Sequence, residues 1–281
     1  MKTVAILLTC HNRKYKTLAC LAALYENTLP EGYVLDVFLV DDGSTDGTSQ
    51  AIRESYPLVN IISGDGNLFW NGGMRMAFDS AMAKEFNYYL WLNDDTILYQ
   101  DTISRAITTV HSLPTNQCAI AVGTTQASRG GSVTYGGLVR VGKGLSYKSK
   151  LIEPSVKPIE CEQMNGNCVL IPAEIVRVVG NLEKRFIHNL GDIDYGMRAR
   201  AAGFKLLVMP GFAGTCDKNS PAGSHLDKRL TFRARMKSVS SGKAFPLVPW
   251  FVFTRRHAGP LWFLYWIKPY FDVVVATIKS K

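Results

Sequence analysis

Several patterns that would quickly assign a protein to a class are absent from this sequence. Its six cysteines (Cys10, Cys20, Cys118, Cys161, Cys168 and Cys216) form no CxxC pair and have no regular spacing, so neither a zinc site nor a disulfide framework is indicated. Free thiols fit a reducing compartment. No GxGxxG motif follows the first expected strand and no GxxxxGK(S/T) motif occurs, which argues against a Rossmann dinucleotide site and a phosphate-binding loop.

Long apolar runs are absent as well. No stretch reaches the ~20 apolar residues of a membrane-spanning helix, and the first apolar run turns polar at His11, which is typical of a strand and not of a signal peptide. The 281 residues are 47% hydrophobic and 20% charged, which fits one large domain or one domain with an appendage. The net charge of +9 suggests acidic partners: anionic lipid, nucleic acid or phosphorylated substrates.

Residues 88–98, YYLWLNDDTIL, organise the rest of the chain. The apolar part predicts a strand buried on both faces, and it ends abruptly on Asn93, Asp94 and Asp95. Two adjacent carboxylates repel each other, and their burial is costly unless a cation or donors compensate. A divalent metal at the carboxyl edge of the sheet is one explanation. A polar turn that caps the next segment is the other.

The first half of the chain alternates between expected strands and helices. Strands are expected at 4–9, 36–40, 59–63 and 88–92, and helices at 16–25, 49–55 and 73–85. This alternation predicts a mostly parallel sheet with right-handed connections and helices on both faces. Polar clusters follow three of the strands, at 9–12, 41–46 and 93–95, so all three are expected at the edge of the sheet where ligands bind.

Four segments, VAILLTCHNR, FLVDDGSTDGT, GNLFWNGGMRMA and WLNDDT, occur in this order and together resemble the nucleotide-binding half of inverting family 2 glycosyltransferases of GT-A fold. The resemblance implies an α/β sheet with helices on both faces. It implies that Thr9 and His11 flank the nucleotide base and that Asp42 accepts a hydrogen bond from it. It also places Asp94 and Asp95 at the DXD motif, where they would hold Mn²⁺ or Mg²⁺, with Asp95 the most direct ligand.

Residues 66–73 resemble the loop that closes over the donor in this family. Glycines allow close approach of the backbone to a ligand, and N–H groups at the start of the following helix suit phosphate. An ordinary glycine-containing loop, with Phe69 and Trp70 in the core, is the alternative. The residues expected at the donor are Thr9, His11, Asn12, Arg13, Asp42, Asn67, Trp70, Asn71, Gly73, Asn93 and Asp94.

The second chemical centre is FIHNLGDIDYGMRARAAG, in which Asp192 and Asp194 open an expected helix. A carboxylate at the start of a helix can cap it and is favoured by the helix dipole, which would explain one of these two residues but not both. The resemblance makes Asp192 the general base, with Gly191 in place of the usual Glu, and the acceptor is expected at Asn165, Gly166 and Asp194. The histidine that completes the metal site in many relatives is absent near residue 216. Either Asp217 takes its place as a ligand, or the metal has fewer protein ligands, or the metal binds only together with the donor.

Two further segments have less regular patterns. Residues 124–158 predict a β-hairpin or mobile flap with little core. Residues 228–243 are basic and precede an aromatic stretch, 245–278, interrupted by Lys and Arg. This pattern fits interfacial helices on an anionic membrane, and packing on the catalytic domain or on a second subunit in a homodimer is the alternative. No recognition motif supports nucleic acid.

These observations predict a GT-A catalytic domain at 1–215, with a nucleotide-binding half at 1–98 and an acceptor half at 99–215, followed by a helical extension at 216–281. The expected reaction moves a sugar from a dTDP- or UDP-linked donor to a hydroxyl of a lipid-linked glycan in bacterial surface polysaccharide synthesis, as in rhamnosyltransferases and O-antigen enzymes. The expected location is the cytoplasmic face of the plasma membrane, as a peripheral protein. A sugar nucleotidyltransferase and a non-catalytic nucleotide-sugar-binding module are the alternatives.

Overall fold

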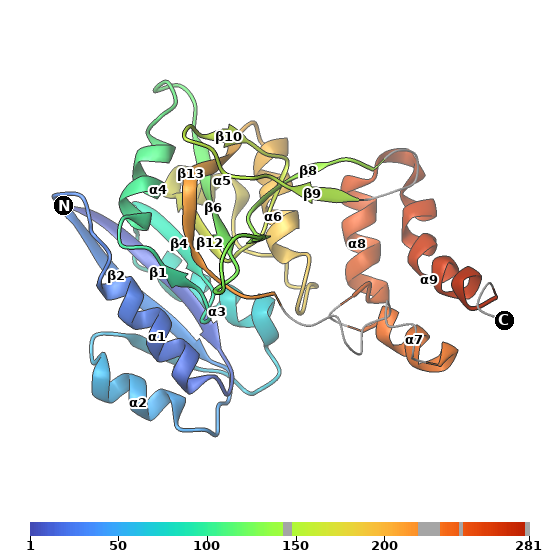
Figure 1. The fold of residues 1–281 in the computed structure, drawn as a ribbon, viewed down its shortest axis with the longest axis horizontal. Coiled ribbons are helices and arrows are strands. Elements are labelled where there is room, and N and C mark those ends of the chain that lie inside the picture. The colour runs from blue at the N-terminus through green and yellow to red at the C-terminus, as the bar shows by residue number, and fades with distance from the viewer. Residues whose placement is uncertain (143–147, 219–230, 242–243, 279–281) are drawn as a thin grey trace.

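The protein is built around one large mixed sheet, seen edge-on in the computed structural model of Figure 1, which describes residues 1–142, 148–218, 231–241 and 244–278. The strand order is β10-β13-β6-β12-β4-β1-β2-β3, and β5 and β7 pair with β13 and β6. The strands are β1 (Lys2–Cys10), β2 (Tyr33–Asp41), β3 (Asn60–Ser63), β4 (Tyr88–Leu92), β5 (Ile97–Leu98), β6 (Ala119–Gln126), β7 (Val133–Tyr135), β10 (Ile159–Glu160), β12 (Cys168–Pro172) and β13 (Lys205–Thr215).

Six helices cover the two faces of this sheet, as the alternation of the sequence predicts. Because side chains alternate along a strand, Val4, Ile6 and Leu8 of β1 pack in one buried cluster, while Ala5 and Leu7 pack in the other. One face is covered by α1 (Lys14–Tyr25), α2 (Thr48–Ser55) and α4 (Thr102–Val110), and the opposite face by α3 (Phe69–Met82), α5 (Ala173–Val179) and α6 (Gly191–Ala201).

The first four long strands run parallel, and their polar ends therefore meet at one edge. β1 lies between β2 and β4, with Cys10 opposite Asp41 and Leu7 opposite Trp91. The sheet is mixed because β12 runs antiparallel to both of its neighbours, β4 and β6. The predicted juxtaposition of the polar clusters at 9–12, 41–46 and 93–95 is confirmed, and it follows from parallel pairing.

Two expectations about local structure are wrong. The helix expected from residue 73 begins at Phe69, so only residues 64–68 form the preceding loop. In segment 124–158 the expectation of little core is wrong, because Thr124 and Thr125 are buried within β6 and Val133 and Thr134 are buried in β7; the predicted β-hairpin is observed, since β7 pairs antiparallel with β6. Short polar and β-branched runs give a weak strand signal, so the sequence alone does not show that these strands form and are buried.

A small second sheet extends from the main body toward the C-terminal helices (Figure 1). It has the order β11-β8-β9 and consists of β8 (Gly137–Arg140), β9 (Ser149–Leu151) and β11 (Gln163–Met164). Arg140 Nη2 donates to Tyr265 Oη at 3.0 Å, which joins this sheet to the last helix.

The C-terminal helices pack against the main body through a separate apolar cluster. They are α7 (Phe232–Val239), α8 (Leu247–His257), a 3₁₀ turn (Gly259–Leu261) and α9 (Trp262–Ile278). Trp250 and Phe253 of α8 pack with Phe186 and Leu190, and Ile193 of α6 contacts this cluster. Packing on the catalytic domain, one of the predicted uses of the tail, is therefore observed. Within the described residues, no helix combines the length and the apolar character needed to cross a bilayer.

Candidate active site

A cleft of about 560 Å³ lies at the carboxyl edge of the sheet. One wall comes from the ends of β1 and β4 and from the start of α3, and the other comes from residues 165–167 and 188–193. Segments far apart in the sequence thus share one cavity, which is of the size that small-molecule sites have. Of the predicted site residues, the cleft is lined by Thr9, His11, Arg13, Asp42, Trp70, Asn93, Asp94, Asp95, Asn165, Gly166 and Asp192.

The two carboxylates after β4 are held by positive charge from the start of α1. Arg13 Nη1 lies 3.0 Å from Asp94 Oδ1 and 3.0 Å from Asp95 Oδ2, and Lys16 Nζ lies 3.8 Å from Asp95 Oδ2. Burial raises the pKa of Asp94 to about 6, against the lowering effect of the Arg13 charge, and the neighbouring charge of Asp95 raises it further. Asp94 is therefore mostly ionised near neutral pH.

The donor atoms at this edge of the sheet suit a divalent cation. Asp94 Oδ2 is buried and has no hydrogen-bond partner, although it belongs to a carboxylate next to a second carboxylate. Carboxylate oxygens are the ligands that Mg²⁺ prefers, and it commonly uses one or two of them together with substrate phosphates. The described residues contain no group of three or more His, Cys, Asp or Glu arranged around one metal position. A metal here would depend on Asp94, Asp95 and atoms that come with the donor.

The structure also narrows the alternatives for a third protein ligand. Asp217 is engaged elsewhere, because Ser128 donates to it from both the backbone N–H, at 2.9 Å, and the hydroxyl, at 2.5 Å. Cys216 lies beside the pair, and its Sγ is 3.4 Å from Asp95 Oδ1. Burial and the charge of Asp95 raise the pKa of this thiol to about 12, so it is neutral at physiological pH and a poor ligand.

Close contacts fix the positions of Trp70 and Thr9 in the donor half of the cleft. Trp70 Nε1 donates to Asn93 Oδ1 at 2.7 Å, which orients the indole beside the acidic pair. Gly73 leaves room for Thr9, since an added Cβ would lie 2.0 Å from Thr9 Oγ1. Glycine is required there because a side chain would displace the threonine that lines the cleft.

Asp42 binds the protein's own backbone. Its Oδ1 accepts from Gly66 N at 2.8 Å, and its Oδ2 accepts from Leu68 N and Phe69 N, each at 3.0 Å. The carboxylate thus ties the end of β2 to the first turn of α3. The hydrogen bond expected from the base would have to be added to these three, so the structural role of Asp42 is to shape the donor loop.

Three other residues expected at the donor do not line the cleft. Asn12 Oδ1 accepts from Thr45 N at 2.7 Å, and Asn67 donates to Asp65 from its backbone N–H, at 2.9 Å, and from its side-chain amide, at 3.4 Å. Asn71 is fully buried, and its Nδ2 donates to the carbonyls of Glu183 and Phe186 at 3.0 and 2.8 Å. These side-chain amides form hydrogen bonds with backbone groups of loops or of the protein interior and do not line the cleft. Asn often has this role, and the sequence does not distinguish it from ligand binding.

Asp192 is presented to the cleft by the first turn of α6. Leu190 has a left-handed backbone, with φ of 72°, so the chain turns sharply just before the helix. Gly166 N donates to Asp192 Oδ2 at 3.0 Å, and an added Cβ on Gly166 would lie 2.6 Å from Trp70 Cζ2. Burial raises the pKa of Asp192, while the N–H groups of Ile193 and Gly166 lower it in part. A carboxylate of raised pKa in a cleft has the properties of a general base.

Asp194 was expected to contact the acceptor, and its position contradicts this. It is fully buried and accepts from Arg198 Nε at 2.8 Å, Arg256 Nη1 at 2.6 Å and His257 Nε2 at 2.9 Å. Burial alone would raise its pKa, but the hydrogen bond with His257 and the charges of Arg198 and Arg256 outweigh this and lower the pKa. Asp194 therefore joins α6 to α8 and faces away from the cleft.

Some lining residues were missed. His188, Asn189, Leu190 and Ile193 all line the cleft and belong to the same sequence segment as Asp192, so their proximity to Asp192 was the available signal. Tyr135 also lines the cleft, from a strand interpreted as a flap. Nothing in the sequence near Tyr135 indicates that β7 returns to the active-site edge.

Comparison with known proteins agrees with this architecture. A sequence model of glycosyl transferase family 2 matches residues 5–170. An N-acetylglucosaminyl-diphospho-decaprenol L-rhamnosyltransferase of Mycobacterium tuberculosis is 25% identical over 202 residues, which are 63% of this chain and 64% of the relative. The chain thus spans slightly less than two thirds of that relative.

Solved structures share the fold. A mannosyltransferase of Pyrobaculum calidifontis in complex with GDP-Man and Mn²⁺ has a TM-score of 0.57 at 15% identity, over 97% of this chain and 69% of that one. Residues 1–349 of S. aureus TarS in complex with UDP have a TM-score of 0.55 at 13% identity, over 91% of this chain and 70% of that one. The predicted GT-A architecture is confirmed by these similarities.

Proposed function

Because the chain belongs to glycosyl transferase family 2, we propose that it transfers a sugar from a nucleoside diphosphate to a hydroxyl of a glycan acceptor with inversion of configuration. The observation that carries this proposal is the shared cleft: Asp94 and Asp95, from the nucleotide-binding half, and Asp192, from the acceptor half, line the same cavity. A carboxylate pair that could hold a metal for the diphosphate and a carboxylate base are thus available on the two sides of one site.

In the proposed reaction, Asp192 accepts the proton of an acceptor hydroxyl as its oxygen attacks the anomeric carbon. A new C–O bond forms to the acceptor, the C–O bond to the diphosphate breaks, and the nucleoside diphosphate leaves with the bonding electrons. Attack opposite the leaving group inverts the configuration. Arg13 and Lys16 provide positive charge on the side of the acidic pair, where charge develops on the leaving group.

A divalent metal would be held by Asp94 and Asp95. It would neutralise charge on the leaving diphosphate when bound. The unpartnered Oδ2 of Asp94 supports this assignment, and Mn²⁺ is present in one of the solved structures of this fold. In the ligand-free chain, Arg13 satisfies the other oxygens and must share them with the metal.

We propose a dTDP- or UDP-linked deoxyhexose as donor and a lipid-linked glycan as acceptor, on the strength of the rhamnosyltransferase relative and its lipid-linked substrate. A catalytic domain at 1–215, a helical extension after it, and a peripheral position on the inner face of the bacterial plasma membrane complete the proposal. The net charge of +9 supports contact with anionic lipid.

The test is release of free nucleoside diphosphate from a panel of nucleotide sugars with Mn²⁺ or Mg²⁺ and a lipid-linked acceptor. Asp192→Asn is expected to lower kcat by about 10²–10⁴-fold, the usual contribution of a general base, with little change in donor affinity. Asp101→Asn, at an exposed Asp outside the cleft, is the control and should keep full activity. Equal turnover by both variants, or absence of donor binding to the unaltered protein, would refute the proposal.

A further inference from the structure

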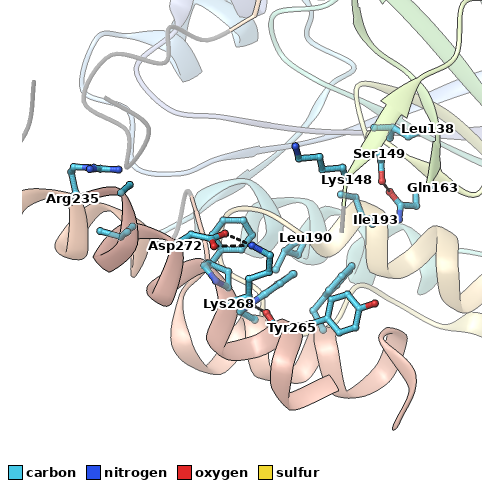
Figure 2. Close-up of a pocket in the computed structure, with 16 residues that line it drawn as sticks. Leu138, Lys148, Ser149, Gln163, Leu190, Ile193, Arg235, Tyr265, Lys268 and Asp272 are labelled. Carbon is cyan, nitrogen blue, oxygen red and sulfur yellow. Dashed lines mark hydrogen bonds and ion pairs between the residues drawn. The ribbon is translucent and has the colours of Figure 1, made fainter. Parts of the chain in front are cut away.

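A second pocket, of about 510 Å³, opens beside the catalytic cleft and has a different chemistry. It lies between the main body and the C-terminal helices. Figure 2 shows Leu138 and Ser149 of the small sheet on one side and Tyr265, Lys268 and Asp272 of α9 on the other. Its lining is mostly apolar and includes Trp250 and Phe253 of α8.

The pocket adjoins the catalytic cleft. Leu190 and Ile193 line both cavities, and Ile193 is the residue next to Asp192. An acceptor whose hydroxyl reaches Asp192 must extend away from the donor, and the second pocket is adjacent to that position. The part of the acceptor that enters this pocket must be largely apolar, because the lining offers few hydrogen-bonding groups.

Cations accompany the apolar lining. Lys148, Arg235 and Lys268 line the pocket, against the single carboxylate of Asp272 among its described lining residues. Lys268 Nζ is paired with Asp272 at 2.6 and 2.7 Å, while Lys148 is exposed just before the start of β9 (Figure 2). A ligand that combines an anionic group with an apolar chain satisfies both features.

The outer surface of α9 indicates where such a ligand comes from. Phe263, Ile267, Phe271 and Val274 are 48%, 49%, 62% and 37% exposed, and their spacing puts them on one stripe of the helix. Exposed apolar stripes on helices with nearby basic residues are typical of helices that lie on a bilayer. At 3.6 residues per turn, this stripe lies on the face of α9 opposite to the pocket residues Tyr265, Lys268 and Asp272, so a chain that leaves the pocket would pass around the helix to reach lipid bound at the stripe.

We propose that this second pocket binds the diphosphate and first isoprene units of a polyprenyl-diphosphate-linked acceptor. The proposal rests on the proposed transfer reaction and assigns its acceptor a site. The apolar lining holds the prenyl chain, Lys148 faces the diphosphate, and the glycan extends past Leu190 and Ile193 to Asp192. The volume suits the first units of the chain only, since sites for small molecules measure ~300–1,000 Å³.

The test measures binding of farnesyl diphosphate, a soluble prenyl diphosphate, to the full chain by calorimetry. Lys148→Glu is expected to weaken binding about tenfold, the effect of losing one charged contact. Lys150→Glu changes the net charge equally, at an exposed lysine of β9 that does not line the pocket, and should leave the Kd within about twofold. Equal effects of the two variants would refute a specific diphosphate site.

A second pair of variants tests the role of the apolar lining of the pocket. Leu138→Asp places a charge in the pocket, whereas Val139→Asp places it on the opposite face of β8, because successive side chains of a strand alternate. Only Leu138→Asp should abolish binding of farnesyl diphosphate. Inorganic diphosphate and farnesol should each bind at least tenfold more weakly than the combined molecule, and equal affinity for either would overturn the proposal.

Two controls separate this proposal from its alternatives. Asp192→Asn should bind farnesyl diphosphate as the unaltered protein does, so pocket binding can succeed even where the proposed transfer reaction fails. Vesicles of anionic phospholipid that displace farnesyl diphosphate would show a membrane-docking surface instead of an acceptor site. A dimer in light scattering that Leu138→Asp dissociates would show that a second copy covers the pocket. Either of these two results would overturn the proposal.

Discussion

The contact between α6 and α8 gives the most direct test of how the catalytic helix is supported. Asp194, at 0% exposure, binds Arg198 of its own helix and Arg256 and His257 of α8. Asp194→Asn keeps the size of the side chain but removes its charge. The new amide N–H group would then face the N–H donors of the two arginines, and Arg198 and Arg256 would lose their shared counter-ion.

The expected loss of stability follows from burial. Removal of one member of a buried ion pair costs about 3–5 kcal/mol, because the partner charge is left uncompensated. For a chain of this length, 1 kcal/mol corresponds to a change in Tm of about 2 °C, so the variant should melt roughly 6–10 °C lower.

Asp101→Asn is a matched control. Asp101 also pairs with an Arg four residues later, Arg105, and the same two atoms, Nε and Oδ2, lie 2.8 Å apart in both pairs. Its side chain is 64% exposed, however, so its loss should cost about 0–1 kcal/mol. Thermal unfolding followed by circular dichroism would measure both variants.

The pH dependence provides a second check. The pKa of Asp194 is lowered in the folded protein, so its stabilisation is present above the unfolded pKa of about 3.9 and is lost as the pH falls through the folded pKa. The difference in Tm between the unaltered protein and Asp194→Asn should therefore be constant near neutral pH and shrink below about pH 4. Equal losses in Tm for Asp194→Asn and Asp101→Asn at pH 7 would refute the reasoning.

Three further predictions concern the cleft. Since burial raises the pKa of Asp192, kcat/KM should fall tenfold per pH unit as the pH drops below that raised pKa, which lies above the ~3.9 of a free Asp. A flat acid limb in a pH–rate profile would contradict its role as base. Gly73→Ala should lower activity and Tm because its Cβ would meet Thr9 Oγ1 at 2.0 Å, whereas the adjacent Gly72→Ala meets Leu68 Cβ at 3.2 Å and should be nearly neutral; similar effects in both would count against the steric argument. Arg13→Gln removes the guanidinium that lies 3.0 Å from both carboxylates, so added Mn²⁺ should raise the Tm of this variant more than that of the unaltered protein; an equal or smaller rise would show that arginine and metal do not compete.

Much of the fold follows from local patterns. The expected strands at 4–9 and 88–92 and the helices at 16–25 and 49–55 match β1, β4, α1 and α2 closely. Each is a strongly periodic or uniformly apolar run bounded by turn residues, so its character does not depend on distant parts of the chain. The boundaries that failed, at α3 and in 124–158, lie where loops or short strands are stabilised by partners elsewhere.

In the candidate site, too, some features follow from local sequence and others depend on distant parts of the chain. Asp94, Asp95 and Asp192 were identified from motifs, and all three line the cleft. Asp192 and Asp194 are only two positions apart, yet at 3.6 residues per turn they point about 200° apart on a helix. One therefore faces the cleft while the other is buried against α8.

The sequence by itself determined which elements form, in what order, and which polar clusters end up at the carboxyl edge of a parallel sheet, because these properties depend on near neighbours and on the pairing rules of strands. Only the tertiary structure decided which polar side chains face ligand and which face protein. Asn71 and Asp42 bind backbone groups, and Asp194 meets Arg256 and His257 from more than sixty residues away. The physical reason is that a buried polar group takes the partners that folding brings within hydrogen-bonding distance, and those partners are not its neighbours in the chain.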